Sequence, residues 1–367
     1  MIKKLKLFNF RNHFQKSFSF EKKLVIFVGN NGVGKTNILE AISFLTSGRG
    51  LKSAKLSEVL NFNNDSENTW GVFAEIENDG ITDEIGTQLS YTKETNKEKR
   101  ISKINGEQIS SQSQLNNFIN IFWLTPDMDN IFSLGATSRR HFLDQICEFF
   151  FPNYSDLLGA YNKLKSERLK LILKNYHNNS EWISAIEKQI VEKAVAIAFE
   201  RNEAIEKLNS QTGKIEETSF PSFYASVEGE IEKMLLDKKA IEVEKFYNEK
   251  LFETRHEDWN RKKTHFGIHK SDFSVINKVK GLPVQLCSTG EQKASLMSVS
   301  IATLLAKINK TRNRPIILLD EVASHLDETR RKELFQLLQN IECQCFMTGT
   351  DEEIFEPIKG KSTIVRL

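Results

Sequence analysis

Proline and cysteine are scarce in this sequence, and neither sign of charge is in excess. The 367 residues include 6 Pro and 4 Cys, and 51 Lys and Arg nearly balance 49 Asp and Glu, for a formal net charge of +2. Few prolines favour helices, and the charge balance excludes a histone-like polycation and an acidic disordered tail. Four cysteines in so long a chain do not make a disulfide framework, and we expect reduced, mostly buried thiols at Cys147, Cys287, Cys343 and Cys345.

Long apolar runs are also missing. No run reaches the roughly 18 residues that a membrane span needs. The first twelve residues mix charged and apolar side chains, which is unlike a secretory signal. We therefore expect a cytoplasmic protein without a membrane partner. Hydrophobic residues make up 39% of the chain and include 26 Phe, enough for a sizeable core, so disordered and collagen-like proteins are excluded.

The periodicity of the sequence changes along the chain. Strand patterns occupy residues 2–10, 23–29 and much of 70–125, with a hairpin turn at Asn105–Gly106. From about Ser138 to Leu251 the spacing is helical, with breaks at Gly213 and near Pro221, and strand patterns return from about His265. This order predicts an α/β fold: a head of mixed β-sheet and flanking helices, with an inserted helical arm domain. The predicted segments are 1–127 for the N-terminal part of the head, 128–260 for the arm and 261–367 for the C-terminal part of the head.

A phosphate-loop motif lies near the N-terminus. Residues 29–36 read Gly-Asn-Asn-Gly-Val-Gly-Lys-Thr, between an apolar strand and an amphipathic helix, and so match GxxxxGK[ST] with both flanks in place. Backbone N–H groups of such a loop and the helix dipole bind phosphate oxygens. We expect Lys35 to reach the β- and γ-phosphates and Thr36 to ligate Mg²⁺. The predicted nucleotide-binding residues are Gly29, Asn30, Asn31, Gly32, Val33, Gly34, Lys35 and Thr36.

Two carboxylates follow a second apolar strand. The run Ile316–Leu319 ends in Asp320 and Glu321. At the carboxyl end of a buried parallel strand, Asp320 is placed to hold Mg²⁺ through water, and Glu321 is placed to polarise an attacking water. Capping of the next helix is the alternative role for two such acids. With the phosphate loop present, we predict Lys35, Asp320 and Glu321 as catalytic residues.

A third motif opens a helix in the C-terminal part. Ser288-Thr-Gly290-Glu291 precedes an Ala-, Ser- and Leu-rich helix and lies 27 residues before Pro315, where the second apolar strand begins. One interpretation is a capping box, Ser-x-x-Glu. The other is the signature loop of ABC-type ATPases, in which Ser288 and Gly290 bind the γ-phosphate held by the opposite subunit. Asp327, soon after the acidic pair, then fits the loop that crosses the dimer interface.

Together these motifs resemble ABC-type ATPases of the chromosome-maintenance class and, within it, the RecF family of bacterial DNA replication and repair proteins. Further segments that carry the resemblance are Phe10-Arg11-Asn12, Gly48–Lys55, Ser138–Asp144 and Gly267–Asp272. In the last, Lys270 replaces an Arg of the family's Gly-Pro-His-Arg-Asp-Asp run, which keeps the charge but not the planar fork. Arg11 and Asn12 are added to the nucleotide-binding residues on this resemblance. The chain has Thr348-Gly349-Thr350 where a transporter ATPase has its switch histidine, which argues against a transporter.

The resemblance implies that the α/β head is an ABC-type ATPase head with an inserted helical arm, and it implies a function on DNA. It implies ATP and Mg²⁺ as cofactors, an ATP-dependent homodimer, weak DNA-stimulated hydrolysis that resets it, recognition of single-strand–duplex junctions at gaps, and help in loading the recombinase RecA, with RecR and RecO as partners. Residues 151–260 carry a net charge of −4, so the remainder carries +6. We therefore expect the DNA contacts mainly on the head. The candidates are Arg49, Lys52, Lys55, Arg139 and Arg140.

Some alternatives stay open at this point. Basic residues from Lys163 to Lys174, including Lys165 and Arg168, either extend the DNA surface or form a solvated helix face. The chain as a whole could also be an SMC-like ATPase of a defence or phage system with another partner. A P-loop kinase or ATPase that does not act on DNA is the remaining possibility.

Overall fold

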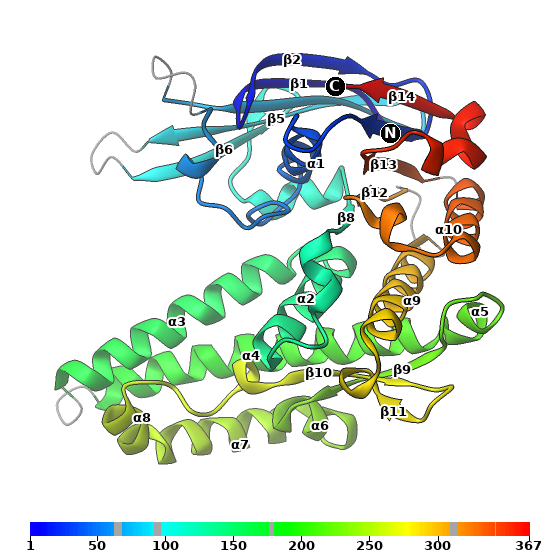
Figure 1. The fold of residues 1–367 in the computed structure, drawn as a ribbon. Helices are drawn as coiled ribbons and strands as arrows, with labels where there is room; N and C mark the ends of the chain where they lie inside the picture. The colour runs from blue at the N-terminus through cyan, green and yellow to red at the C-terminus, as the bar shows by residue number, and fades with distance from the viewer. Residues whose placement is uncertain (62–67, 92–96, 176–179, 309–313, 342) are drawn as a thin grey trace. The chain divides into compact units, whose positions relative to one another are not determined.

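The computed structural model describes residues 1–61, 68–91, 97–175, 180–308, 314–341 and 343–367 (Figure 1). The chain forms two compact units. Unit 1 combines Met1–Met128 with Lys307–Leu367, and unit 2 is Asp129–Ala306. Residues 261–306, which the sequence analysis assigned to the head, therefore group with unit 2, and the predicted boundary at residue 260 falls inside that unit.

Unit 1 contains an antiparallel sheet of local strands. Its order is β2-β1-β4-β5-β6-β7. The predicted turn at Asn105–Gly106 is confirmed: both residues have positive φ, and they join β6 to β7. Strand β2 was not predicted, because it is an edge strand with mostly exposed polar residues. The strands are β1 (Ile2–Phe10), β2 (His13–Ser19), β4 (Gly71–Asn78), β5 (Ile81–Tyr91), β6 (Glu98–Ile104) and β7 (Glu107–Gln108).

A second, parallel sheet in unit 1 draws its strands from the whole chain. Its order is β14-β3-β13-β12-β8, and every neighbouring pair is parallel. Strands β3, β12 and β13 are buried along their full length, as expected for apolar runs covered on both faces. The elements are β3 (Leu24–Val28), β8 (Ile121–Leu124), β12 (Ile316–Leu319), β13 (Gln344–Gly349) and β14 (Ser362–Arg366), with the helices α1 (Lys35–Ser43) and α10 (Glu328–Asn340).

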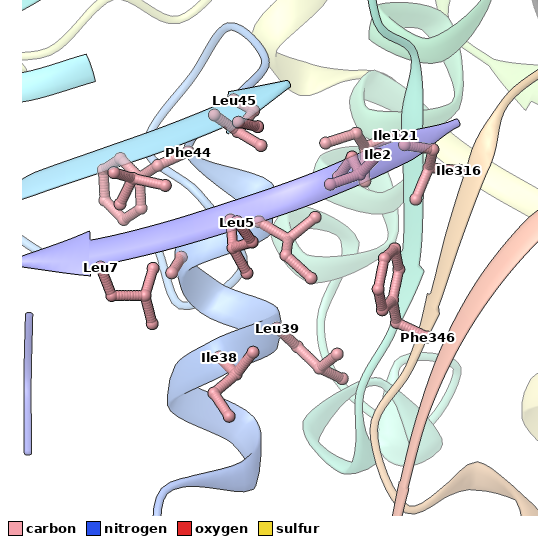
Figure 2. Close-up of a cluster of buried hydrophobic side chains, with 14 of the residues drawn as sticks. Ile2, Leu5, Leu7, Ile38, Leu39, Phe44, Leu45, Ile121, Ile316 and Phe346 are labelled. Carbon is pink, nitrogen blue, oxygen red and sulfur yellow. The ribbon is translucent and has the colours of Figure 1, made fainter. Parts of the chain in front are cut away.

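One hydrophobic core joins these two sheets and α1 (Figure 2). Alternation along β1 sends Leu5 and Leu7 inward, where they are almost fully buried, and leaves Lys6 and Phe8 on the opposite face. The inward side chains pack with residues of α1 and of the parallel sheet, namely Ile38, Leu39, Ile121, Ile316 and Phe346. This packing fixes α1, and with it the end of the phosphate loop, against both sheets.

Unit 2 is mainly helical but contains a small antiparallel sheet. Strand β9 (Phe223–Glu228) pairs with β10 (Asp272–Asn277), which pairs with β11 (Leu282–Pro283). The sequence analysis was wrong to expect helix alone up to Leu251. Gly213 also lies within a short helix rather than at a break. The helices are α2 (Ala136–Phe150), α3 (Tyr154–Asn175), α4 (Ser180–Asn209), α5 (Thr212–Glu216), α6 (Glu230–Asp237), α7 (Ala240–Glu253), α8 (Arg255–Arg261) and α9 (Thr289–Ile308).

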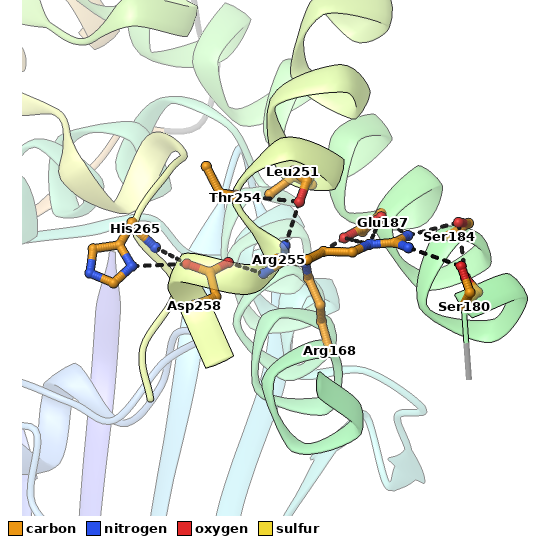
Figure 3. A network of polar contacts seen from close by, with 9 residues as sticks. All are labelled: Arg168, Ser180, Ser184, Glu187, Leu251, Thr254, Arg255, Asp258 and His265. Atoms are coloured by element: carbon orange, nitrogen blue, oxygen red, sulfur yellow. Dashed lines mark hydrogen bonds and ion pairs between the residues drawn. The ribbon is translucent and has the colours of Figure 1, made fainter. Parts of the chain in front are cut away.

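A buried ionic network ties α3, α4 and α8 together (Figure 3). Arg168 is fully buried; its Nε donates to Glu187 at 2.8 Å, and its Nη1 donates to Asp258. Arg255 also donates to Glu187, and His265 Nδ1 lies 2.9 Å from Asp258. Both alternatives for Arg168, a DNA contact and a solvated face, are therefore wrong. Among the helices described, none is long and apolar enough to span a membrane.

Candidate nucleotide-binding site

The phosphate loop has the flanks that the sequence predicted. It leaves the carboxyl end of β3 and leads directly into α1 at Lys35. Gly32 and Gly34 have φ of +85° and +105°, a region that glycine adopts without strain. A Cβ on Gly34 would also stand 2.5 Å from the side chain of Asn12, so another residue here would be strained and would displace Asn12. The loop is therefore a tightly curled backbone at a helix N-terminus, which is the arrangement that binds phosphate.

Lys35 lies against the loop that it follows. Lys35 is 4% exposed, and its Nζ donates to the carbonyl oxygens of Gly29 and Asn30 at 2.7 and 3.0 Å. This position holds an ammonium group at the inner side of the curl. A cation there can neutralise phosphate oxygens that the loop's N–H groups bind.

The segment Arg11–His13 braces the loop from outside. Asn12 Nδ2 donates to Val33 O at 3.0 Å, and the ring of His13 lies 3.2 Å from Gly34 O. Burial lowers the pKa of His13, so the ring is neutral at physiological pH. Asn12, predicted as a nucleotide contact, thus already supports the loop, and His13 is a supporting residue that the sequence analysis missed.

Arg11 lies close to the loop but is engaged in an ion pair. Its guanidinium makes a two-pronged pair with Glu40 on α1, with Nε–Oε2 and Nη2–Oε1 distances of 2.9 and 2.6 Å. The Glu40 side chain is fully buried, so this pair anchors α1 to the β1–β2 turn. Arg11 reaches this geometry with φ of +55°. The observed contacts give it a positioning role next to the predicted nucleotide-binding role.

Thr36 and Asp320 meet across the parallel sheet. Thr36 Oγ1 donates to the Asp320 carboxylate, at 2.9 Å from both oxygens. Strand β13 lies between β3 and β12, and Thr348 on β13 donates to Asp320 Oδ1 at 2.7 Å. Thr348 Oγ1 also accepts the backbone N–H of Glu321 at 2.8 Å. The sequence analysis used Thr348 only as an argument against a transporter, whereas here it orients both predicted catalytic acids.

This donor set fits Mg²⁺. One hydroxyl and one carboxylate stand together beside the phosphate loop, and magnesium is commonly held by one or two such oxygens with phosphate and water completing its shell. No group of three or more His, Cys, Asp or Glu side chains suited to a metal occurs within the described part of the chain. A site at Thr36 and Asp320 therefore depends on oxygens that a bound nucleotide brings.

Glu321 has an unusual backbone. Its φ of +54° places it in the left-handed region, which costs a non-glycine residue about 1–3 kcal/mol. The hydrogen bond from its N–H to Thr348 holds this conformation, and its side chain is half-buried. Asp320, by contrast, is 4% exposed. Two consecutive acids thus have different environments: the first is buried and held by hydroxyl groups, and the second is half-buried.

The predicted signature residues lie in unit 2, at the start of α9. Ser288 N donates to Glu291 Oε2 at 3.0 Å, which is one half of a capping box. Ser288 Oγ also donates to the same oxygen, at 2.8 Å. Hydrogen bonds from Lys280 and then from Ser288 lower the pKa of Glu291 to about 2. A Cβ on Gly290 would meet no described atom within 4 Å. The cap is therefore real, but nothing described in this chain explains why residue 290 is glycine.

Gln292 is a buried residue that sequence reasoning missed. It donates to the carbonyl oxygen of Cys287 at 3.0 Å and accepts from Ser133 Oγ at 2.6 Å. Lys293 pairs with Asp129 at 2.8 Å. These contacts hold the Ser288–Gly290 turn to the start of unit 2.

Asp327 caps α10 in unit 1. Its side chain accepts the backbone N–H of Arg330 at 2.9 Å, and the residue is exposed. An exposed cap is compatible with the predicted place at a dimer interface, but it also has this local role.

The predicted DNA-contacting residues fall into two groups. Arg49, Lys52 and Lys55 are exposed in unit 1, and Lys52 Nζ lies 3.3 Å from Asn37 Oδ1 on α1. In unit 2, Arg139 makes a two-pronged ion pair with Asp272, at 2.9 and 2.7 Å. Arg140 donates instead to the carbonyl oxygen of Ser271 at 2.8 Å. Arg139 is thus neutralised by a carboxylate, whereas Arg140 is not.

Arg140 belongs to a group of cations from three elements, which we name the Arg140 cluster: Arg140 on α2, Lys165 on α3 and Lys270 beside β10. Lys165 Nζ lies 5.4 Å from the centre of the Tyr161 ring, and Tyr161 donates to or accepts from His269 Nδ1 at 2.8 Å. Burial, and then the charges of Arg140 and Lys270, lower the pKa of Lys165. Burial and the same three cations bring the pKa of His269 down to about 4. These cations therefore act on one another and on His269, while Asp144 and Asp272 act on Arg140 in the opposite sense.

Comparison with known proteins identifies relatives over nearly the whole chain. The family model described as the RecF/RecN/SMC N terminal domain matches residues 1–366. The DNA replication and repair protein RecF of Mesorhizobium japonicum is 36% identical over 362 residues, which is 98% of this chain and 94% of that protein.

Two solved structures share the fold. The structure of the recombination mediator protein RecF-ATPrS in the RecFOR pathway has a TM-score of 0.83 at 24% identity. The superposition covers 96% of this chain and 93% of the other. An Smc head domain from Pyrococcus furiosus, bound to the C-terminal domain of ScpA, has a TM-score of 0.52 at 16% identity, covering 100% of this chain and 92% of the other. The predicted α/β head fold of the ABC and SMC type is confirmed.

Proposed function

Because this chain belongs to the RecF family of DNA replication and repair proteins, we propose that it is an ATP-dependent DNA-binding protein of recombinational repair. ATP binding, dimerisation on ATP and recognition of gapped DNA are parts of this proposal. The observation that carries it is the meeting of the phosphate loop, Thr36 and Asp320 at the carboxyl ends of β3 and β12, the two strands on either side of β13. Ligands of open α/β sheets bind at that edge.

Each residue of the site then has a role toward ATP. The N–H groups of residues 29–34 bind phosphate oxygens, and Lys35 neutralises the β- and γ-phosphates. Thr36 and Asp320 hold Mg²⁺, whose charge offsets that of the phosphates when it is bound. Glu321 orients and deprotonates the water that attacks the γ-phosphate, while Thr348 keeps both acids in place.

We assign dimerisation to the start of α9. Ser288 and Gly290 of one protomer bind the γ-phosphate held by its partner. Gly290 supports this, because the space where its Cβ would be is open in the chain and suits the close approach of a ligand. The N-terminus of α9 also carries the positive end of the helix dipole, which favours an anion.

DNA contacts are assigned to the Arg140 cluster together with Arg49, Lys52 and Lys55. Three cations that repel one another and lie beside a neutral histidine are stabilised by an anion such as a backbone phosphate. Arg139 is the matched control, because its charge is already used by Asp272. Specificity for single-strand–duplex junctions and loading of RecA with RecR and RecO complete the proposal.

The test is DNA binding by the full chain, with and without ATP, over a range of salt concentrations. Wild type is expected to bind gapped duplex more tightly with ATP. Arg140→Gln should lower the salt slope by roughly 0.9, the value for one phosphate contact on duplex DNA. Arg139→Gln should leave that slope unchanged and lower thermal stability instead. DNA binding that is independent of ATP, or equal slopes for Arg140→Gln and wild type, would contradict the proposal.

A further inference from the structure

The outward face of the antiparallel sheet in unit 1 carries a groove of about 580 Å³. Residues of five strands line it, from β2 through β1, β4 and β5 to β6. Five strands are separated by four spacings of about 4.8 Å each, so the groove is roughly 19 Å long, which is enough for several nucleotides. Cross-strand pairing builds its floor: Phe8 lies opposite Gly71, and Phe73 lies opposite Gly86. Because glycine has no side chain, each of these rings stands next to an open space on the surface of the sheet.

Phe8 lines this groove, and Phe14 on β2 lies next to Phe8 and outside the lining residues. Phe14 is 55% exposed and Phe8 is 36% exposed, and their ring centres are 6.0 Å apart. The inward face of the same strands is packed into the core, so these rings contribute little to that core. Burying them against a ligand is favourable, at about 25 cal/mol per Å² of apolar surface. Two neighbouring exposed rings on a sheet are a stacking platform for flat groups.

The charge of the groove has one sign. Two lysines whose strand register places them on the outward face line it, Lys6 and Lys103, and no Asp or Glu is among its lining residues. Lys6 Nζ lies 5.3 Å from the centre of the Phe73 ring, so a cation and a ring already adjoin. Just outside the groove on the same face, Lys4 is paired with Glu75 at 2.9 Å. The occupant of the groove must therefore be negatively charged and must also offer flat apolar groups.

We propose that this groove binds single-stranded nucleic acid, with unpaired bases stacked on Phe8 and Phe14 and backbone phosphates neutralised by Lys6 and Lys103. Bases of a duplex are stacked on one another and are not available to the rings. An acidic protein segment would match the lysines but has no reason to need exposed rings next to glycines. This inference rests on the proposed DNA-binding function and deepens it, by giving the unpaired strand of a gap its own surface, separate from the Arg140 cluster.

The experiment measures anisotropy of a labelled oligo(dT) with the full chain over a range of salt concentrations. Phe14→Ala and Phe8→Ala should each weaken binding by roughly 5- to 100-fold without changing the salt slope, because stacking releases no counterions. Lys103→Gln should lower the salt slope by about 0.7, the value for one phosphate on a single strand. Ile81→Ala, which removes another exposed side chain of this sheet, and Lys4→Gln are the matched controls and should bind like wild type. Thermal unfolding of each variant confirms that it is folded.

Three results would overturn the inference. In the first, the Phe8→Ala, Phe14→Ala double variant binds oligo(dT) as tightly as wild type, while Arg140→Gln still weakens duplex binding. The proposed function would then stand without this groove. Another is binding of poly-glutamate with the same dependence on Phe8 and Phe14, which would assign the groove to an acidic protein segment. The last is a wild-type chain that binds no DNA with or without ATP, and this result would remove the proposed function as well.

Discussion

Replacing Thr348 by valine removes one hydroxyl and keeps the branched shape of the side chain. That hydroxyl donates to Asp320 at 2.7 Å and accepts the N–H of Glu321 at 2.8 Å, and Thr348 is 1% exposed. Valine therefore leaves a buried N–H without its acceptor and takes one of two hydroxyl donors from Asp320. A bond to a charged group contributes about 1.5–3 kcal/mol and a neutral one about 0.5–1.5 kcal/mol, so the free energy of unfolding should fall by about 2–4 kcal/mol.

The effect on hydrolysis should exceed the effect on nucleotide binding. Loss of a residue that orients a metal ligand commonly costs 10- to 100-fold in activity or metal affinity, and we expect the turnover of Thr348→Val to fall by that factor. Nucleotide affinity should change little, because the phosphate loop and Lys35 make no contact through Thr348. Thr348→Ser restores the hydroxyl and should recover most of the turnover.

The assays are urea unfolding, ATP titration and single-turnover hydrolysis on the same preparations. Thr303→Val is the control for loss of a buried hydroxyl, because Thr303 Oγ1 donates to Val299 O within its own helix. Thr303→Val should hydrolyse ATP at nearly the wild-type rate. The reasoning is refuted if Thr348→Val hydrolyses ATP at the wild-type rate, or if Thr348→Ser is as impaired as the valine variant.

Three further predictions concern other parts of the chain. Lys35→Ala should abolish ATP binding in a direct titration, because it removes the cation inside the loop, and unchanged affinity would count against the site. Ser288→Arg should leave ATP affinity intact but block dimerisation in analytical ultracentrifugation with ATP; a normal dimer would mean that the segment is only a helix cap. Arg168→Met should lower the free energy of unfolding by about 3–5 kcal/mol, since it takes one partner each from the buried Glu187 and Asp258, whereas Lys170→Met on the same helix should be neutral in urea unfolding.

The phosphate loop could be predicted because everything that defines it is local. Its glycines, lysine and both flanking elements lie within about twenty consecutive residues, so strand, turn and helix patterns agree. The acidic pair after β12 could be predicted for the same reason. The role of Thr348 could not, because it depends on β13 lying between β3 and β12 in the sheet.

Strand β9 shows a local signal that was overlooked. Phe223, Ala225 and Val227 alternate with more exposed residues directly after Pro221, which is a strand pattern set within helical sequence. Arg168 is the opposite case. Its partners Glu187 and Asp258 are 19 and 90 residues away, so the sequence gives no means of telling it from the exposed lysines around it.

The strand order of the parallel sheet has a consequence for synthesis of the chain. The antiparallel sheet takes all its strands from the first 108 residues, so its pairing partners follow one another closely during translation. Strand β3 instead lies between β13 and β14, which end at Gly349 and Arg366. The ribosome must add roughly 320 residues after β3 before its neighbours exist, which takes about 15–60 s at 5–20 residues per second. During that interval β3 is a five-residue apolar strand with two unpaired edges, which makes it an aggregation hazard until β13 and β14 pair with it.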